Sequence, residues 1–509
     1  MTSTTSPNNR IHSRFLKRTS RRRPATVAAV ASIALAATLA SAPASSADPV
    51  DLHGSPTVSI HDSAPTGWAS VGSTPAGPGT NGGSDAPPAN VHVVSTLAEL
   101  KTATLNNGDP KAPKIIYIRG TINGNEAPDG KILGEQDYAP GYDIQKYMSC
   151  FLDNGKTWSD QAFPYCKQMR QLRQQGSNAM KRQIEVNLPS NTTLLGLDDD
   201  SGLVGANIIM NVASNVVIRN LSIESPVDWF TTWSPDDGDG AWNARFDCVS
   251  AVTSDHIWID HVLVTDGRYP DSKAPKDFKN EPVIRHDGLL DLKDGTDFVT
   301  ISNSQLKDHD KTSLLGSGDE HVDKDGGKLR VSFISNLFEN TQQRGPRVRF
   351  GQVHVLNNYF VGSSEDPDYP MISEAQGGTS YFIGAGYDSR IFSEYNAFDY
   401  SGPNADESIT VTSYNGNMFS DTGSWFNGEP VNLEAVAQGS FEERKAEAVA
   451  AAAESGTEVP EWAQRDFTSD VGWSPSDNYG YRTLKSPDAV RNAVLHFSGP
   501  GVIKVQEGK

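Results

Sequence analysis

The sequence lacks an apolar run long enough to cross a lipid bilayer. Its longest such run, ATVAAVASIALAATLA, spans about 16 residues, whereas a transmembrane helix needs roughly 20. Seven basic residues and no acid precede the run, and small residues, SAPASSA, follow it. A basic start, a short apolar centre and a small-residue end are typical of a signal peptide. We therefore expect residues 1–47 to be a signal peptide and the protein to be secreted and extracellular, with no membrane partner.

Basic residues are also scarce relative to acidic ones. The chain holds 44 Lys and Arg against 63 Asp and Glu, a net charge of −19, and removal of the seven leader bases would leave −26. Nucleic acids are bound by clustered basic surfaces, so we expect no nucleic-acid partner. A polyanionic substrate would bind only where local cations, from side chains or a metal, override this field. Three adjacent arginines leave both the general and the twin-arginine export routes open.

Cysteines are few. Of the three, Cys150 and Cys166 lie 16 residues apart in a loop-like segment, while Cys248 lies in the strand-like run FDCVSAV. Because an exported chain can form disulfides, we predict a bond between Cys150 and Cys166 and a buried free thiol at Cys248.

The N-terminal part after the leader is poor in core-forming residues. Between about residues 65 and 90 it is rich in Gly, Ser, Pro and Ala, which bury too little apolar surface to form a core. We expect residues 48–90 to be a linker or a wrapping coil, and residues 91–509 to form one domain. The Ala/Glu-rich stretch 433–456 predicts a helical insertion packed outside that domain.

Short strand-like segments recur through the remaining sequence, and most end near Asn or His. Residues at the same place in these segments are separated by 41, 42, 33, 22 and 38 positions; they are Asn220, His261, Asn303, Asn336, Asn358 and Asn396. A repeat of 20 to 50 residues indicates a solenoid or a propeller, and the lack of helices between the strands argues against α/β crossovers. We predict an all-β fold, a right-handed single-stranded parallel β-helix with long loops and a few peripheral helices. Its asparagines, Asn303, Asn336 and Asn358 among them, would form a hydrogen-bonded ladder between coils, although single turn asparagines are common.

Acidic residues gather on neighbouring coils. Asp287 and Asp291 in HDGLLDL are four apart and would point the same way on a strand, and Asp247 lies about one coil earlier. Three convergent carboxylates are hard oxygen ligands suited to Ca²⁺. Solvated turn aspartates are the alternative reading of these residues.

Basic residues follow on the next coils. Lys311 lies 20 residues after Asp291, and Arg344, Arg347 and Arg349 surround Pro346. Alternation along a strand would put the last two arginines on one face. An anion site and a structural ion-pair cluster remain equally open for the arginines, and a lone lysine is usually a solvated charge.

Four ordered motifs resemble the pectate lyases of polysaccharide lyase family 1: WIDH (258–261), DGLLD (287–291), HDKTSLLG (309–316) and RGPRVRFGQVHVLNNY (344–359). The resemblance covers roughly residues 90–430. It implies that Asp247, Asp287 and Asp291 bind calcium, that Arg344 is the catalytic base, and that Lys311 and Arg349 bind the substrate carboxylate. It also suggests Asp237 and Asn243 as outer ligands of a further calcium.

This resemblance implies a calcium-dependent pectate lyase that cleaves polygalacturonate, de-esterified pectin, by β-elimination. A guanidinium is cationic at neutral pH, so an arginine base predicts an alkaline pH optimum. Three rivals remain: a pectin lyase acting on methyl-esterified substrate, a β-helical hydrolase with paired carboxylates flanking a water, and a non-catalytic polysaccharide-binding β-helix. We expect a monomer by default.

Overall fold

The computed structural model describes residues 57–74, 77–403 and 405–506, all of which belong to one unit, Ser55–Lys509. The expected signal peptide, residues 1–47, lies outside the described residues. No helix in the described part of the chain is both long and apolar enough to cross a membrane.

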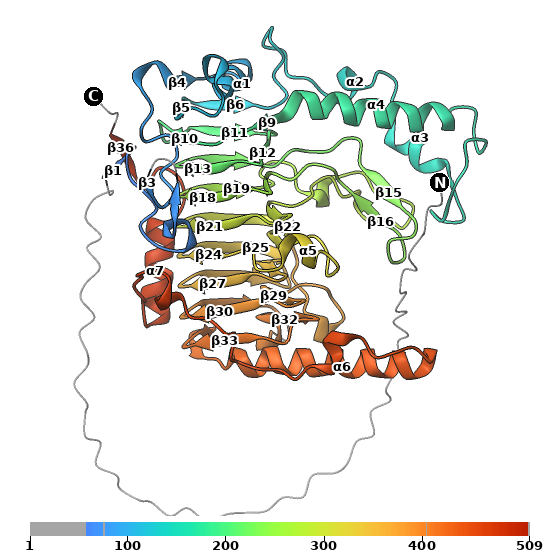
Figure 1. Cartoon of the computed structure of the whole chain (residues 1–509). Coiled ribbons are helices and arrows are strands. Elements are labelled where there is room, and N and C mark those ends of the chain that lie inside the picture. Colours follow the sequence, from blue (N-terminus) through green and yellow to red (C-terminus); the bar gives the residue numbers. More distant parts are fainter. Residues whose placement is uncertain (1–56, 75–76, 404, 507–509) are drawn as a thin grey trace, which may run out of the picture. The chain divides into compact units, whose positions relative to one another are not determined.

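Three long sheets wind around a common core and form a parallel β-helix (Figure 1). The first sheet contains β4 Val91–Val94, β5 Lys114–Ile118, β10 Thr192–Gly196, β13 Ser214–Arg219, β18 Asp255–Asp260, β21 Asp297–Ser302, β24 Val331–Ile334, β27 Gln352–Leu356, β30 Arg390–Glu394 and β33 Phe419–Thr422. The second contains β6 Thr121–Asn123, β11 Gly202–Val204, β14 Ser222–Glu224, β19 Leu263–Thr265, β22 Gln305–Lys311, β25 Leu337–Gln343, β28 Tyr359–Ser363, β31 Ala397–Ser401, β34 Trp425–Phe426 and β35 Glu429–Pro430. The third contains β9 Glu185–Asn187, β12 Asn207–Asn211, β17 Val249–Val252, β20 Leu290–Lys293, β23 Leu314–Leu315, β26 Arg347–Val348, β29 Ile383–Gly386 and β32 Val411–Tyr414.

The strands stack in register because alternate apolar side chains point into the core. In one column of the first sheet, β-branched aliphatic residues pair from coil to coil: Val216, Ile257, Val299, Val331, Val353 and Ile391. All six are fully buried. In the second sheet Phe360 stacks between Phe338 and Phe398, with ring centroids 4.7 and 4.6 Å apart. Each coil therefore continues the core of the one before it.

The repeating turn residues form two columns, which corrects the single in-phase series expected from the sequence. Strand register aligns Asn220, His261 and Asn303 with one another, and all three have left-handed backbones, with φ of 53°, 52° and 45°. Asn336 and Asn358 lie one register position after this first column, and they form the second column, the hydrogen-bonded ladder. The error arises because each recurring segment holds two strands separated by a bend, and either residue of the bend can be asparagine.

The ladder links four coils through fully buried amides. Asn358 accepts hydrogen bonds from the backbone N–H and the side chain of Asn336, at 2.9 and 3.0 Å, and donates to Phe333 O and to Asn396. Asn336 accepts from the Ser304 N–H, so a serine and not Asn303 begins the ladder.

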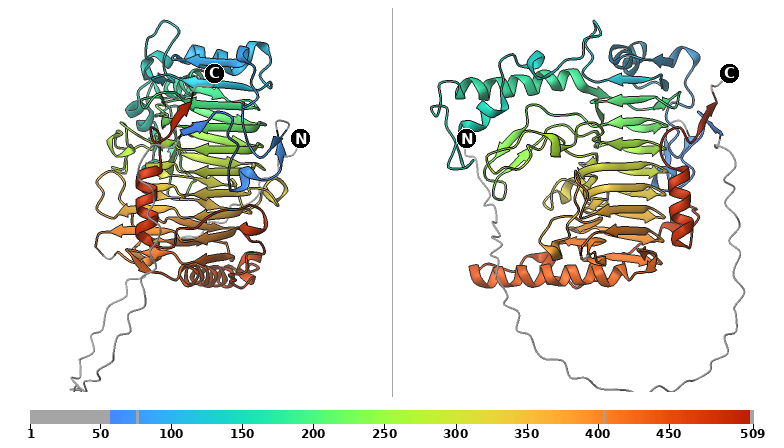
Figure 2. Two further views of the ribbon diagram at one scale, coloured as in Figure 1. Left: turned by 90° about the vertical axis from the view of Figure 1, so that its left-hand side faces the viewer. Right: turned by 180° about the vertical axis from the view of Figure 1, so that it is seen from behind.

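The described part of the Gly-rich segment, from residue 57, wraps along the first sheet. The N–H groups of Trp68 and Ala69 donate to the hydroxyls of Ser332 and Thr300. The C-terminal segment lies on the same sheet, where the Tyr479 hydroxyl meets Ser332 and His354. The two segments meet where β1 (Thr57–Ser59) pairs with β36 (Lys504–Gln506) (Figure 2).

Helices cover both ends of the stack. Leu97 and Leu100 of α1 (Leu97–Leu105) join the main core at one end, and Leu433 and Ala437 of α6 (Leu433–Ser455) join it at the other (Figure 1). The remaining helices of four or more α-helical residues are α2 Glu135–Tyr138, α3 Ile144–Ser149, α4 Cys166–Ile184, α5 Val322–Asp325 and α7 Pro487–Phe497.

A side extension has a core of its own. It comprises α2 to α4 and two antiparallel hairpins, β7 (Phe151–Leu152) with β8 (Thr157–Trp158) and β15 (Thr232–Ser234) with β16 (Ala241–Asn243). Phe230, Trp233 and Trp242 lie in its aromatic core. Cys150 and Cys166 form a disulfide here, and Cys248 is a buried free thiol.

Candidate active site

Successive coils bring the predicted site residues to the boundary between the second and third sheets. Asp247 lies two residues before β17, and Asp291 lies in β20, where it pairs with Ser250. Lys311 ends β22 and pairs with Gln343, directly before Arg344. Sequence separations of 20 to 44 residues thus become steps between stacked strands.

A lysine ammonium joins two of the three aspartates. Lys293 Nζ lies 2.8 Å from Asp247 Oδ2 and 3.1 Å from Asp291 Oδ2. Both carboxylates are buried, Asp291 to 2% exposure. Their other oxygens accept backbone hydrogen bonds, from Gly288 N to Asp247 and from Leu314 N to Asp291. Such bonds fix the carboxylates before any ligand arrives.

The third aspartate faces a different cation. Asp287 Oδ1 lies 3.7 Å from Lys311 Nζ, and Asp287 is half-buried. Gly288 allows the turn that brings Asp287 and Asp291 to the same place, because a Cβ at this position would collide with the Asp291 carboxylate. The sequence prediction that the carboxylates converge therefore depends on a glycine between them.

Burial and like charges dominate the electrostatics here. Burial, reinforced by Asp291 and Asp287 and opposed by Lys293, raises the pKa of Asp247 to about 7. Burial alone would lower the pKa of Lys293, but Asp291 and Asp247 outweigh it and raise that pKa. One lysine thus leaves the buried carboxylates with excess negative charge.

The arginines lie on the next coil. Arg344 has a left-handed backbone, with φ of 60°, a conformation that costs a non-glycine residue about 1 kcal/mol or more and often marks functional positions. Its Nε is buried and has no hydrogen-bond partner among the residues that the structure describes. Arg349 Nε pairs with Asp319 at 2.7 Å, and the Arg347 guanidinium stacks 4.0 Å from the Tyr414 ring centroid. Burial lowers the pKa of Arg347, assisted by Arg349 and Arg344 and opposed by Tyr381 and Tyr414.

A buried network supports the strand that carries Lys311. His309 Nδ1 lies 2.6 Å from Asp266 Oδ1, and the Tyr369 hydroxyl donates to the other oxygen of Asp266. All three side chains are buried. The network anchors β22 two residues before Lys311, and so supports the strand end that carries this lysine.

The donor set of the acidic cluster suits a hard cation. Carboxylate oxygens are the ligands that calcium prefers, and Asp291 and Asp287 add to the effect of burial in raising the pKa of Asp247. Among the described residues, however, no three His, Cys, Asp or Glu side chains are arranged to hold one ion, because Asp287 turns to Lys311. The chemistry of the residues fits calcium, and Lys293 neutralises part of their charge.

Asp237 and Asn243 belong to the β15–β16 hairpin. Asp237 lies exposed in the turn of the β15–β16 hairpin, and Asn243 lies in β16, where its amide donates to Ser234 Oγ at 3.0 Å. Within the described residues, no hydrogen bond or ion pair joins either residue to Asp247, Asp287 or Asp291.

Sequence reasoning missed Lys293. A signal for it was present, because Lys293 lies two residues after Asp291 and strand alternation places both on one face. Its bridge to Asp247 could not be seen without the register of β17 and β20.

Comparisons with known proteins agree with this geometry. Residues 171–501 match the family model described as pectate lyase. A pectate lyase of Bacillus subtilis (strain 168) is 34% identical over 425 residues, covering 83% of this chain and 90% of the relative. Pectate lyase E of Dickeya chrysanthemi is 34% identical over 436 residues, covering 84% and 89%.

Solved structures give the same result. A structure described as a pectate lyase bound to hexasaccharide covers 87% of this chain and 98% of its own, with 32% identity and a TM-score of 0.72. A pectate lyase of Acidovorax avenae subsp. citrulli covers 91% and 99%, with 25% identity and a TM-score of 0.74. A shared β-helix and a sequence match over most of both chains show that this chain belongs to the pectate lyase family and is a polysaccharide lyase.

Proposed function

We propose that this protein is a secreted, calcium-dependent pectate lyase that cleaves α-1,4-linked polygalacturonate by β-elimination, giving 4,5-unsaturated oligogalacturonates. The observation that carries the proposal is the stacking of buried Asp247 and Asp291 beside Lys311 and Arg344 on consecutive coils. This order of charges supplies both an acidic cation site and basic groups for an anionic sugar.

Asp247, Asp287 and Asp291 would hold the calcium ion. When bound, the ion would supply positive charge to offset the charge that develops at the substrate carboxylate. Lys311 and Arg349 donate hydrogen bonds to the same carboxylate. Arg349 shares its guanidinium with Asp319, which orients it while leaving other N–H groups for substrate.

Arg344 removes the proton from C5 of the galacturonate ring. The electron pair of the C5–H bond forms the C4–C5 double bond, the C4–O bond breaks, and the leaving oxygen takes up a proton. No water is consumed. Arg344 directly follows Gln343, which pairs with Lys311, so both basic residues can reach one sugar unit. Because the Nε of Arg344 is buried, the proton would be taken up at a terminal guanidinium nitrogen, since a base must reach the proton that it removes.

We also propose that Asp237 and Asn243 bind a further calcium ion together with substrate. Asp237 is exposed and Asn243 is half-buried on the β15–β16 hairpin, where an ion can be shared with the polymer. For the whole chain, a monomer that acts outside the cell on pectate is the expected form.

One assay tests the proposal. Purified protein is incubated with polygalacturonate, with and without chelator, and the absorbance of the unsaturated uronide is followed. Chelator-sensitive absorbance is the expected result. Absorbance from methyl-esterified pectin alone would indicate a pectin lyase, reducing ends without absorbance would indicate a hydrolase, and binding without cleavage would indicate a non-catalytic β-helix.

A further inference from the structure

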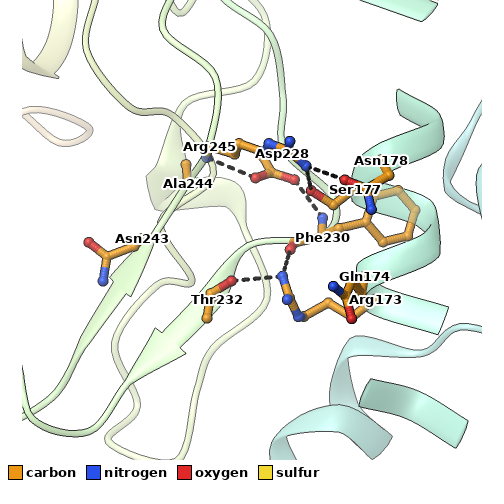
Figure 3. Close-up of a pocket in the computed structure, with 10 residues that line it drawn as sticks. All are labelled: Arg173, Gln174, Ser177, Asn178, Asp228, Phe230, Thr232, Asn243, Ala244 and Arg245. Atoms are coloured by element: carbon orange, nitrogen blue, oxygen red, sulfur yellow. Dashed lines mark hydrogen bonds between the residues drawn. The ribbon is translucent and has the colours of Figure 1, made fainter. Parts of the chain in front are cut away.

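A polar pocket of about 460 Å³ lies between α4 and the β15–β16 hairpin, outside the cluster described above (Figure 3). Two arginines line it, Arg173 from α4 and Arg245 from the segment after β16. Its volume lies within the range of small-molecule sites, roughly 300 to 1,000 Å³. The pocket therefore has room for a sugar ring.

Each arginine is held by a single nitrogen. Nη1 of Arg173 donates to Phe230 O and Thr232 Oγ1, at 2.9 and 2.7 Å. Nη1 of Arg245 donates to Ser177 Oγ and Asn178 Oδ1, at 3.0 and 2.8 Å. All four acceptors are neutral. The contacts fix both guanidinium groups and leave their other N–H groups available.

Neither arginine has an ion-pair partner within the described residues. The carboxylate of Asp228 lines the pocket, but its oxygens accept the backbone N–H groups of Phe230 and Arg245, at 2.8 and 3.0 Å. Burial raises the pKa of Asp228 to about 6, so it is ionised at neutral and alkaline pH. Two guanidinium groups and one carboxylate leave a net charge of +1.

The charge and shape of the pocket favour a carboxylate as the ligand group. A guanidinium fork matches a carboxylate in a bidentate pair, and one net positive charge matches a monovalent anion better than a divalent phosphate. Thr232 and the exposed amide of Gln174 lie on the same walls and can bond sugar hydroxyls.

The pocket adjoins the reaction site along the chain. Arg245 is two residues before Asp247, and two residues span at most about 7 Å. A polymer bound at Asp247 can therefore reach the pocket with a neighbouring unit. In a chain with a net charge of −19, such a local cationic pocket offsets repulsion of a polyanion.

We propose that Arg173 and Arg245 form a uronate subsite, which binds the carboxylate of a galacturonate unit other than the one that reacts. This inference rests on the proposed function for its substrate. It adds a recognition element on the side extension, distinct from the groups that move the proton.

The test measures binding and turnover separately. Hexagalacturonate is titrated by calorimetry into the cleavage-deficient Arg344→Lys protein, with and without Arg173→Gln or Arg245→Gln. We expect each pocket substitution to weaken binding about 10-fold, the loss of one charge-assisted fork. In the protein with Arg344 intact, the same substitutions should raise KM while kcat stays unchanged.

Arg170→Gln is the matched control. This substitution also removes one positive charge from α4, one turn before Arg173. Arg170 pairs with Asp160 outside the pocket, so the affinity for hexagalacturonate should equal that of the protein without the substitution. Arg245→Gln is the more conservative variant, since the hydrogen bonds of Arg245 go to side chains, whereas Arg173 also holds the backbone carbonyl of Phe230. Melting temperatures check folding.

Unchanged hexagalacturonate binding in both folded pocket variants would overturn the inference. An equal loss in Arg170→Gln would also overturn it, because the effect would then be one of net charge. Inorganic phosphate is titrated in parallel, and a pocket that holds phosphate but leaves hexagalacturonate binding unaltered would contradict a uronate subsite. Absence of unsaturated product from the unsubstituted protein would instead refute the proposed function, while the binding titration would still report on the pocket.

Discussion

Gly288 lacks a side chain at the point where the Asp291 carboxylate folds back over the turn. In Gly288→Ala we expect the carboxylate or the turn to shift, which weakens apparent calcium affinity about 10-fold or more, as changes around metal ligands often do. The measurement is lyase rate against calcium concentration.

Gly439→Ala is the control for this substitution. Gly439 lies in α6, and a Cβ there meets nothing within 4 Å. Alanine should raise helix stability by up to about 1 kcal/mol and leave the calcium titration unaltered. Equal calcium affinity in both variants would contradict the role given to Gly288.

Arg344→Lys tests the base. We expect kcat to fall by about 10² to 10⁴, the usual contribution of a positioned base, with an unchanged melting temperature. The unsubstituted enzyme should show an alkaline pH optimum, because a guanidinium must lose its proton to act as a base. Arg491→Lys, on α7 and paired with Asp399, should keep full activity. An optimum near pH 5 would rule out Arg344 as the base.

Asp421 links pH to stability far from the acidic cluster. Burial raises its pKa to about 6, assisted by nearby Glu434 and opposed by hydrogen bonds from Ser393 and Ser424. The unfolded value is about 3.9. Between these values the folded state binds more protons, so this group's contribution to stability is full below about pH 4 and is lost as pH rises through 6.

Asp421→Asn should remove this dependence. The difference in unfolding free energy, variant minus unsubstituted, should grow by at most about 3 kcal/mol between pH 4 and pH 8, since a tenfold change in proton affinity is worth about 1.4 kcal/mol. Urea unfolding across this pH range is the measurement. A constant difference would show that Asp421 titrates normally.

At the scale of elements, the asparagine ladder joins coils that are otherwise linked by strand pairing. Asn358→Ala leaves the buried N–H of Asn336 and the carbonyl of Phe333 without partners. Each orphaned group costs about 1 to 3 kcal/mol, so we expect a loss of about 2 to 5 kcal/mol in unfolding free energy. Asn492→Ala, on the exposed face of α7, should change stability by less than about 0.5 kcal/mol.

The same ladder shows what the sequence could reveal. Recurring turns predicted the β-helix because strand periodicity and turn residues are local properties. The sequence did not separate the left-handed column from the ladder, since Asn303 and Asn336 both end strand-like segments. The role of Lys293 was not predicted for a related reason, because its ion pair with Asp247 joins residues 46 positions apart. Contacts between coils depend on register, which no single segment encodes.

At the scale of the whole molecule, negative charge opposes a negative substrate. Raising NaCl from about 10 to 150 mM shortens the screening length from about 30 to 8 Å. We expect kcat/KM for polygalacturonate at fixed, saturating calcium to rise over this range, because screening relieves the repulsion of the acidic body. Trigalacturonate, with fewer charges, should show a smaller rise. A steep fall for both substrates would mean that the local cations dominate the encounter.

Helices α1 and α6 close the two ends of the strand stack. Without them, the first and last coils would present rows of unpaired backbone groups, which template the addition of further strands. A β-helix resembles a short fibril in this respect, and helices of the same chain prevent further strands from adding to its ends. Replacing Leu433 and Ala437 on the inner face of α6 by charged residues should therefore expose the last coil. We expect end-to-end polymers and a loss of solubility before any loss of lyase activity.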